Sequence, residues 1–561
     1  MKKLSTIFLL TGMYFSPQAQ GQTSVTYNDV APIFYAHCTS CHHDGGGAPF
    51  PLMNYTDASS WSTNISNAVQ GKNGILMPPW HADTNYVTSG HAGARFVSEN
   101  IITYAEKNKI IQWVANGALQ GDTTLAPTAP KYGPMPYQLN GTADLTLQIP
   151  AFTSNANLPG TTPVSNPYDC FGISSGLTQG RWLRAIEIVP GEFTNGSSVN
   201  VVHHVVVTVD TTGATAASLT NTTGSCGNQG GNFGVGGWSA GSPPVVFPSD
   251  PSFKTGIWIP AGSTFILQIH YAPGSGGKSD STKIRLFFYP IGTTAGIRPM
   301  HSDVMLQYWG GGLGPAGGTP IPANAVTTLS AISTTSRVPT HAYQPSTAMS
   351  LFAANPHSHN VCRKMKLYAY KSTAPIDTIP VIRISDWNYN WQGNYYYPTL
   401  LKIPVGYTLK TEHTYDNTVN NPHLSGPPVS TPFGQTTADE MLFDAFLWLD
   451  YQTGDENIDI KSLIAKDTLL RVGINEIAAS SGIQSFIYPN PASDNVSIYI
   501  SKKSVYKGRI YNITGQTVLN TETFSDKITV DVKNIPVGLY IIEITDTKTN
   551  ERIAKKIIVS N

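Results

Sequence analysis

Charged side chains are scarce in this chain of 561 residues. They make up 12% of the sequence, and Lys plus Arg balance Asp plus Glu at 35 each. A typical soluble domain carries about 25% charged residues. A net charge of zero argues against a nucleic-acid binder and against a polybasic membrane binder. After the N-terminal segment no stretch approaches about 18 uninterrupted apolar residues, so we expect no transmembrane segment.

Cysteine is also rare: the five cysteines are too few for a disulfide scaffold and odd in number. Glycine (51) and proline (40) are plentiful instead. Few charges combined with many turn-forming residues predict a mainly β protein, neither disordered nor a helical enzyme. The length corresponds to about three to four domains. The 14 histidines direct attention to metal-binding patterns.

Residues 1–21 have the composition of a secretory signal peptide. Lys2 and Lys3 give a basic start, Leu4 to Phe15 is a short apolar run, and small residues follow. No cysteine precedes Cys38, which argues against a lipoprotein anchor. We therefore expect an exported, secreted protein in a compartment where disulfides persist.

Residues 483–561 have a different composition, with more charge and short alternating strands, the pattern of a small immunoglobulin-like sandwich. YPNPASDNVSIYI, GQTVLNTE, NIPVGLYIIEI and a basic final strand follow in this order. The ordered set resembles the type IX secretion C-terminal sorting domain. The resemblance implies export across the outer membrane to the cell surface or the medium, with the type IX machinery as partner. An ordinary immunoglobulin-like module is the alternative.

Residues 22–122 contain the motif C-x-x-C-H, formed by Cys38, Cys41 and His42. Two thiols at this spacing can bond to both vinyl groups of a haem, and the histidine then faces the iron. A redox dithiol and half of a zinc site are the alternatives for a lone C-x-x-C pair. Met77 in LMPPW is the candidate second axial ligand, because a thioether suits the iron of an electron carrier.

The sequence around this motif predicts a small α-helical cytochrome c with one covalent haem c. Val30, Ile33 and Phe34 have helical spacing before the motif. Residues 99–118 predict an amphipathic helix with an apolar stripe of Ile101, Tyr104, Ile111, Trp113 and Val114. Rivals for the axial position are His37, His43, His81 and His91. A Pro-rich linker follows at 123–143.

The central region predicts two β-sandwiches, at 144–308 and 309–482, because β-branched, alternating segments separated by Gly and Pro turns exceed the length of one sandwich. His203 and His204 are neighbours on one predicted strand and should point to opposite faces. A shared metal would require a bulge or a strong twist there, and one buried plus one exposed histidine is the alternative. His270 in LQIHY, taken alone, is more typical of a core residue.

Two further signals follow along the chain. His357 and His359 in PHSHN lie on one face of an extended segment, which is natural geometry for two ligands of one metal. Met441 in DEMLF lies next to aromatic residues and, taken alone, is typical of core packing.

RWLRAIEIVPG, VVHHVVV, LQIHY, PHSHN and DEM together form an ordered set. The sequence resembles the copper type II, ascorbate-dependent monooxygenases, which include the peptidylglycine α-hydroxylating and dopamine β-monooxygenases, and most of all their bacterial relatives fused to a cytochrome c. The resemblance covers roughly residues 144–470. It implies two jelly-roll-like sandwiches that face each other across a solvent-filled cleft. It implies one copper held by His203, His204 and His270, and another held by His357, His359 and Met441.

The resemblance also implies the chemistry. In the family, the copper with the methionine ligand binds O2, the resulting species takes a hydrogen atom from an sp3 C–H bond, and the other copper supplies the second electron. A thioether is a poor ligand for zinc and favours Cu(I), so the second set decides the metal. Ascorbate is the family reductant, and the fused haem suggests a protein route for electrons. The catalytic residues are then His357, His359 and Met441.

The chain departs from the peptide-amidating members at several positions. Asn355 and Ala445 replace the Arg and Tyr that grip a substrate carboxylate, so a peptide C-terminus is not the expected substrate. Leu442 and His413 occupy the positions of a family disulfide. By the same resemblance Cys170 pairs with Cys226, with two buried thiols as the alternative. Cys362 is left over and is expected to be a buried free thiol. Gln268 matches a family position near the first copper.

The favoured function is therefore a secreted copper-dependent monooxygenase that hydroxylates an unknown small-molecule or peptide-like substrate with O2. Its electrons come from ascorbate, from the fused haem c or from a redox partner protein. A non-catalytic haem and copper protein on the same scaffold is the alternative, and an adhesive surface protein is a second one. Histidines expected to be structural or solvated are His301, His341, His413 and His423.

Overall fold

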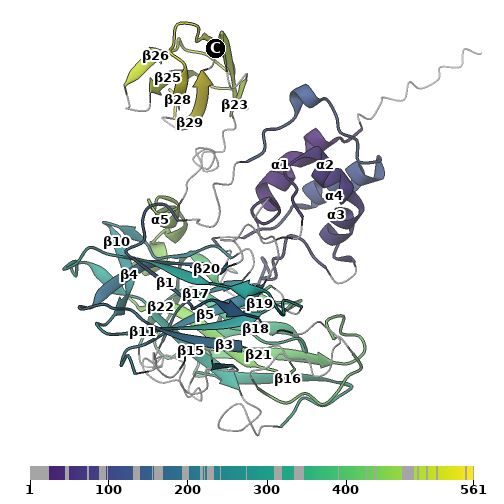
Figure 1. Cartoon of the computed structure of the whole chain (residues 1–561), viewed down its shortest axis with the longest axis vertical. Coiled ribbons are helices and arrows are strands. Elements are labelled where there is room, and N and C mark those ends of the chain that lie inside the picture. Colours follow the sequence, from purple (N-terminus) through teal and green to yellow (C-terminus); the bar gives the residue numbers. More distant parts are fainter. Residues whose placement is uncertain are drawn as a thin grey trace, which may run out of the picture.

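The computed structural model of the chain is mainly β and falls into a helical N-terminal module, a large β body and a small C-terminal β module (Figure 1). It describes residues 24–43, 48, 50–72, 75–86, 96–97, 99–130, 139–154, 156, 168–191, 201–214, 219, 222–223, 233–239, 242–272, 274–308, 319–333, 347–389, 391–424, 426–434, 438–470, 485–488, 492–500, 503–512, 516–549 and 552–559. The predicted signal peptide, His91, Cys226 and His341 lie outside these residues.

The N-terminal module consists of α1 (Tyr27–His37), α2 (Tyr55–Ser60), α3 (Ser62–Val69) and α4 (Tyr104–Ala115), followed by the short 3-10 helix η2 (Thr123–Leu125). Val30, Ile33 and Phe34 are buried, as their spacing predicts. The buried face of α4 differs from the predicted stripe: Ile110 and Trp113 are fully buried, whereas Tyr104 is 80% exposed. Tyr104 is the first residue of α4 and lies between Thr103 and Glu106, which form the capping box, so it lies at the end of the packed face.

The first sandwich has one sheet in the order β1-β13-β4-β10-β14, with β8 beside β4 and β9 beside β10, and a second sheet in the order β6-β3-β11-β5-β7. Its strands are β1 (Leu145–Gln148), β2 (Phe152–Thr153), β3 (Tyr168–Ser174), β4 (Arg181–Val189), β5 (Val202–Asp210), β6 (Thr222–Thr223), β7 (Phe233–Ser239), β8 (Val245–Val246), β9 (Ser249–Asp250), β10 (Phe253–Ile259), β11 (Thr264–Tyr271), β12 (Ser279–Asp280), β13 (Lys283–Phe288) and β14 (Ile297–Pro299). β2 and β12 form a separate pair.

The second sandwich packs the sheet β15-β22-β17-β20 against the sheet β16-β21-β18-β19. Its strands are β15 (His301–Tyr308), β16 (Ala325–Ile332), β17 (Met349–His357), β18 (Cys362–Lys371), β19 (Asp377–Ile384), β20 (Tyr395–Ile403), β21 (Thr408–Asn417) and β22 (Leu442–Asp450), followed by η5 (Asp455–Asn457) and α5 (Ile460–Ala465). The predicted boundary at 308 is wrong, because β15 pairs with β22 along its whole length. The first sandwich therefore ends before His301.

The two sandwiches share one apolar core. Phe352, Ala353 and Leu449 of the second sandwich belong to the same buried cluster as the first sandwich's Phe247 and Leu183. Residues after β22 return to the first sandwich, where Ile460 is fully buried in that cluster. Asp467 also forms an ion pair with Arg184 at 2.7 Å. The β body is therefore a single packed unit rather than two separate domains on a linker.

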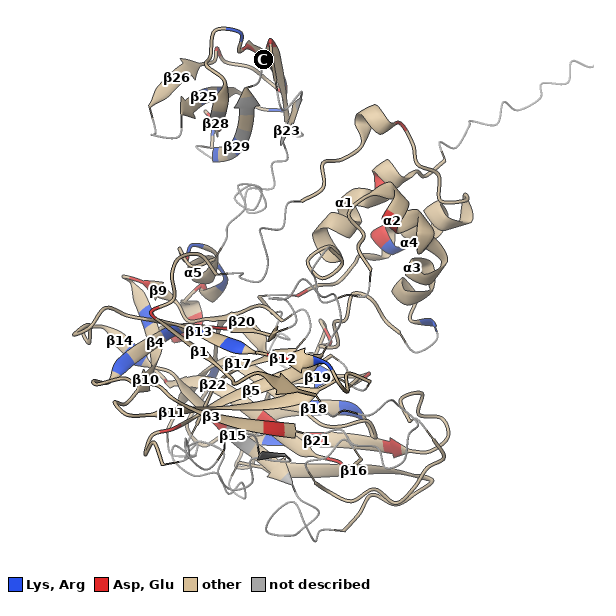
Figure 2. Cartoon of the chain, in the orientation of Figure 1, with Lys and Arg blue, Asp and Glu red and all other residues tan. Residues whose placement is uncertain are grey.

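The C-terminal module is a small sandwich with its own core, in which β23-β24-β27 faces β26-β25-β28-β29. Its strands are β23 (Ser485–Tyr488), β24 (Asn495–Ile500), β25 (Tyr506–Asn512), β26 (Thr517–Asn520), β27 (Lys527–Asp531), β28 (Gly538–Asp546) and β29 (Arg552–Val559). Among the described residues, no helix is both long and apolar enough to cross a membrane. Charged side chains are few on the β body, and both signs are interspersed (Figure 2).

We predict that Phe352→Ala lowers the free energy of unfolding of the β body by about 3–5 kcal/mol, because it leaves a cavity in the core that joins the sandwiches. Phe352 is fully buried. Urea unfolding followed by tryptophan fluorescence measures the change. Ile376→Ala is the control: this residue is 80% exposed, so its effect should stay within about 0.5 kcal/mol. Equal effects of the two substitutions would contradict the shared core.

Candidate metal centre

Cys38, Cys41 and His42 lie on one turn that directly follows α1. Cys38 caps the helix, and its carbonyl accepts hydrogen bonds from the backbone N–H groups of Cys41 (3.1 Å) and His42 (2.9 Å). Both thiols are free. Burial raises the pKa of Cys38 to about 12, whereas the cysteine of a redox dithiol has a lowered pKa.

The His42 ring is oriented by a hydrogen bond between its Nδ1 and the carbonyl of Phe50, at 2.8 Å. That bond places the proton on Nδ1 and leaves Nε2 as the ligand atom, the arrangement that metal-bound histidines use. The backbone N–H of Met77 donates to the carbonyl of Ala68 near the end of α3 (3.0 Å), and the Met77 side chain is half-buried. The residues of this module thus fit a haem c.

Three of the rival axial histidines are described, and Nδ1 of His43 faces a backbone carbonyl as Nδ1 of His42 does. His37 contacts Asn100 through Nδ1 at 2.9 Å and Glu106 through Nε2 at 3.6 Å. Nδ1 of His43 lies 2.7 Å from the carbonyl of Thr39. His81 hydrogen-bonds the backbone of Asp386 in the second sandwich.

The bulge required for His203 and His204 is present. On β11, His270 pairs with His204 and Tyr271 pairs with Val202, so His203 is the extra residue of β5. A bulge turns the side chain of the extra residue away from its regular face. Nδ1 of His203 consequently lies 3.0 Å from Nδ1 of His204 and 3.3 Å from Nδ1 of His270.

These three histidines form a tripod of nitrogen donors, with ligand atoms that all lie within 4.8 Å of one another. Separations near 3 Å suit nitrogens that share one ion at about 2 Å. Burial lowers the pKa of His204 and His270 well below 6.5, and the neighbouring histidines lower it further. Both rings are therefore neutral, which is the form that binds metals. We call His203, His204 and His270 the first triad.

His357 and His359 are both held in the tautomer that carries its proton on Nδ1. Nδ1 of His357 lies 2.8 Å from Oε1 of Gln392, and Nδ1 of His359 lies 2.9 Å from the carbonyl of Asp439. Both partners accept, so each Nδ1 carries the proton and each Nε2 keeps its lone pair. Nε2 of His359 is buried with no hydrogen-bond partner among the described residues. Burial next to His359 lowers the pKa of His357 to about 3.

Met441 lies beside this pair, at the start of β22. Its carbonyl accepts hydrogen bonds from the hydroxyls of Tyr415 (2.8 Å) and of Ser358, the residue between the two histidines. The fully buried carboxylate of Glu440 accepts from the backbone N–H groups of His359 (3.0 Å) and Met441 (3.0 Å). Glu440 thus ties both halves together, a role that the DEM motif alone did not indicate. We call His357, His359 and Met441 the second triad.

One tyrosine, absent from our sequence predictions, contacts both triads. The Tyr389 ring centroid lies 5.5 Å from that of His203 and 5.3 Å from that of His359, and its hydroxyl is 3.3 Å from Nδ1 of His270. The Tyr168 hydroxyl is a further 3.2 Å away. An aromatic side chain therefore stands between the two sets of histidines.

Tyr389 belongs to the segment between β19 and β20, residues 385–394, which we call the β19–β20 loop. The same loop supplies Gln392 to His357, and its Trp387 donates through Nε1 to the carbonyl of His359 (3.2 Å). The carbonyl of Gln392 accepts from Ser239 of the first sandwich at 2.6 Å. The loop therefore fixes the triads relative to each other. The aromatic and polar residues of this loop follow one another without helical or strand periodicity, so the sequence pattern did not predict this role.

The remaining predicted positions are also defined. Cys170 is disulfide-bonded, and its predicted partner Cys226 lies outside the described residues. Cys362 is a fully buried free thiol, as expected. Nε2 of His413 contacts Asp444 at 3.2 Å, with both side chains fully buried. Gln268 lies two residues before His270 on β11, so the two share a face.

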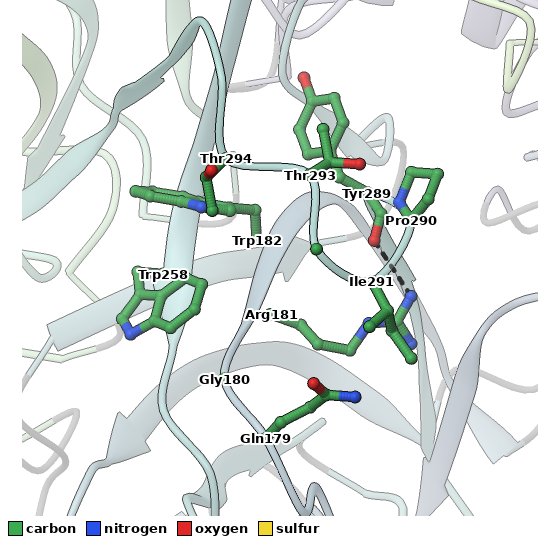
Figure 3. A pocket seen from close by; sticks show the side chains of 11 residues that line it. Gln179, Gly180, Arg181, Trp182, Trp258, Tyr289, Pro290, Ile291, Thr293 and Thr294 are labelled. Carbon is green, nitrogen blue, oxygen red and sulfur yellow. Dashed lines mark hydrogen bonds between the residues drawn. The ribbon is translucent and has the colours of Figure 1, made fainter.

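A separate pocket of about 260 Å³ lies on the other sheet of the first sandwich (Figure 3). Trp182 and Trp258 line it, with ring centroids 5.2 Å apart, as does the turn after β13 that includes Ile291. Neither triad contributes to it.

Comparison with known proteins identifies the end of the chain. Residues 486–560 match the family described as the secretion system C-terminal sorting domain. β-Agarase D of Zobellia galactanivorans is 36% identical over 74 residues, which is 13% of this chain and 14% of that protein. An endo-acting ulvan lyase of Formosa agariphila is 35% identical over 74 residues, with the same shares. This chain thus matches about one-seventh of the length of these relatives.

The sorting domain, predicted from the sequence, is confirmed, and it indicates export by type IX secretion to the cell surface or the medium. Among solved structures, a β-glucuronidase of Ruminococcus gnavus matches with a TM-score of 0.13 and 10% identity over 38% of this chain and 33% of that chain. Its apo structure matches with a TM-score of 0.15 and 11% identity over 49% and 47%. These values support no conclusion about fold or activity.

We predict that the metal-free protein loses stability as the pH falls from 6.5 towards 5. Unfolded histidines take up protons below pH 6.5, whereas His204, His270 and His357 stay neutral in the folded protein because their pKa values are lowered. Each contributes a loss of about 1.4 kcal/mol per pH unit in this window. Urea unfolding of the metal-free protein at several pH values measures the slope. His357→Gln should reduce the slope by one histidine's share, and an unchanged slope would contradict the assignment.

Proposed function

We propose that this protein is an exported copper-dependent monooxygenase, with a haem c module that feeds it electrons. The two β-sandwiches are the jelly-roll-like copper domains of that class, and the N-terminal module is a cytochrome c. The observation that carries the proposal is the convergence of five histidines, buried or half-buried, into two groups on either side of Tyr389.

The two donor sets fit copper on chemical grounds. Imidazole nitrogens suit both oxidation states of copper, and the thioether of Met441 favours Cu(I). Zinc would accept the first triad, but a thioether is a poor zinc ligand. The first triad offers three Nδ1 atoms, whereas the second offers two Nε2 atoms and one sulfur.

The side chains around the triads have defined roles in this proposal. Gln392 and the carbonyl of Asp439 orient the second pair of rings, and Glu440 holds the backbone that carries both His359 and Met441. Tyr389 fills the space between the triads, and its hydroxyl lies 3.3 Å from Nδ1 of His270. Bound copper would supply O2 activation at the second triad and a stored electron at the first.

The substrate class is narrowed by Asn355 and Ala445, which are direct partners across β17 and β22. The Asn355 side chain donates to the carbonyl of Gly393 (3.1 Å) and contacts Asn394 at 3.0 Å. It supports the β19–β20 loop, and Ala445 has no polar group. Neither position offers a charge for a substrate carboxylate, so we propose a substrate that lacks a peptide C-terminus.

We expect two coppers and one haem iron per chain, measured by metal analysis of the full-length protein. Cu(I) X-ray absorption should show a copper–sulfur contribution in wild type that is absent in Met441→Ala, because Met441 is the proposed sulfur ligand. Met365→Ala is the matched control: this methionine is 1% exposed in the core of the same sandwich, so the sulfur contribution should remain. Zinc in both sites, or a sulfur signal unchanged in Met441→Ala, would contradict the proposal.

Uptake of O2 that depends on an added C–H substrate distinguishes the enzyme from its alternative. Two coppers and one haem without such uptake, across a broad substrate panel, would leave an electron-transfer protein on the same scaffold.

A further inference from the structure

The N-terminal module is attached to the β19–β20 loop by a segment that starts three residues after Met77. We call residues 80–97 the tether; residues 80–86 and 96–97 of it are described. Ala82 forms a β-bridge with Ile384, and the backbone N–H of Asp83 donates to the carbonyl of Arg383 at 2.8 Å. The Asp83 carboxylate also pairs with the Arg383 guanidinium and accepts from the hydroxyl of Ser385 (2.7 Å). These contacts hold the first end of the loop.

The second end of the loop is held by the two ends of the tether. Trp80 and Phe96 each pack on Tyr395 with ring centroids 5.3 Å apart. The backbone N–H of Val97 donates to the carbonyl of Tyr396 at 2.8 Å. Trp80, Ala82 and Phe96 join the apolar core of the second sandwich. The described residues of the tether are therefore docked on the second sandwich, and Val97 also packs against the core that the two sandwiches share.

A short chain of bonds leads from the tether to the second triad. His81 hydrogen-bonds the backbone of Asp386 and is only four residues from Met77. The next residue, Trp387, is fully buried and donates through Nε1 to the carbonyl of His359. Electron transfer is faster through covalent and hydrogen bonds than across an equal gap of space. Two hydrogen bonds and a few peptide units thus connect the candidate axial ligand of the haem to a candidate ligand of copper.

We propose that electrons from the haem module enter at the second triad, through His81, Asp386 and Trp387, and reach the first triad only afterwards, past Tyr389. This inference rests on the proposed function. In the first step one electron leaves the haem, whose iron changes from ferrous to ferric, and one Cu(II) at the second triad becomes Cu(I). No covalent bond forms or breaks, and no proton is transferred.

The test uses the full-length protein loaded with haem and copper, fully oxidised and without O2 or substrate. A light pulse with a flavin reductant reduces the haem, and its visible absorbance then reports reoxidation, while freeze-quench EPR reports the loss of Cu(II). We expect a fast phase in wild type that persists in His204→Ala and is lost in His359→Ala. A fast phase lost in His204→Ala and kept in His359→Ala would place the entry at the first triad and overturn the proposal.

Trp387→Phe tests the route itself, because it keeps an aromatic ring and removes the hydrogen bond to His359. Trp448→Phe is the matched control: Trp448 is a buried tryptophan of the same sandwich whose Nε1 donates to Asp303 at 3.0 Å, away from the tether. With copper content unchanged in both, we expect slower reoxidation in Trp387→Phe and the wild-type rate in Trp448→Phe. Equal rates in the two variants would overturn the route through Trp387.

The outcome also separates this inference from the proposed function. Wild-type protein that binds two coppers but reoxidises its haem no faster than copper-free protein contradicts the route and the haem's role as electron donor, and it leaves only the copper-dependent hydroxylase part of the proposed function intact. Protein that binds no copper contradicts both.

Discussion

The central constraint in this structure is that each nitrogen of a buried imidazole needs a partner, because bulk water does not reach it to form a hydrogen bond. In the second triad, Gln392 and the carbonyl of Asp439 each take one Nδ1–H, which leaves Nε2 of His359 buried and without a hydrogen-bond partner among the described residues. In the first triad, Nδ1 of His203 lies within 3.3 Å of the other two Nδ1 atoms. Neutral imidazole rings held in these positions are arranged to bind a cation, and they are poorly arranged to hydrogen-bond one another.

The surrounding architecture maintains that arrangement. The bulge at His203 brings two adjacent residues of one strand to the same point, and the shared core of the two sandwiches fixes the distance between the triads. The positions at which the resemblance to the copper monooxygenases implies a disulfide and a substrate clamp have other contacts in this structure. The fully buried contact between His413 and Asp444 links β21 to β22, and Asn355 supports the β19–β20 loop.

Part of the site could be predicted from local signals in the sequence, whereas His270 and Met441 were placed in it only by the family resemblance. The pair His357 and His359 shares a face by strand periodicity alone, and the spacing of Cys38, Cys41 and His42 specifies one turn. The need for a bulge at His203 also followed from side-chain alternation. Tyr389 and Glu440 could not be predicted, because each acts through contacts with segments distant in sequence. The same reason explains why β15 was assigned to the wrong sandwich: strand pattern gives no information about the pairing partner.

The tether changes how a fused electron donor should behave. A flexible linker would give the N-terminal module, the proposed haem carrier, an effective concentration on the order of millimolar at the β body, with every orientation sampled. A segment that adds a β-bridge, an ion pair and three aromatic contacts to the second sandwich removes most of that freedom. These contacts are what offsets the cost in conformational entropy of ordering the segment. The docked residues lie beside Trp387, whose indole contacts the backbone of His359, and this is the placement that the proposed electron route requires.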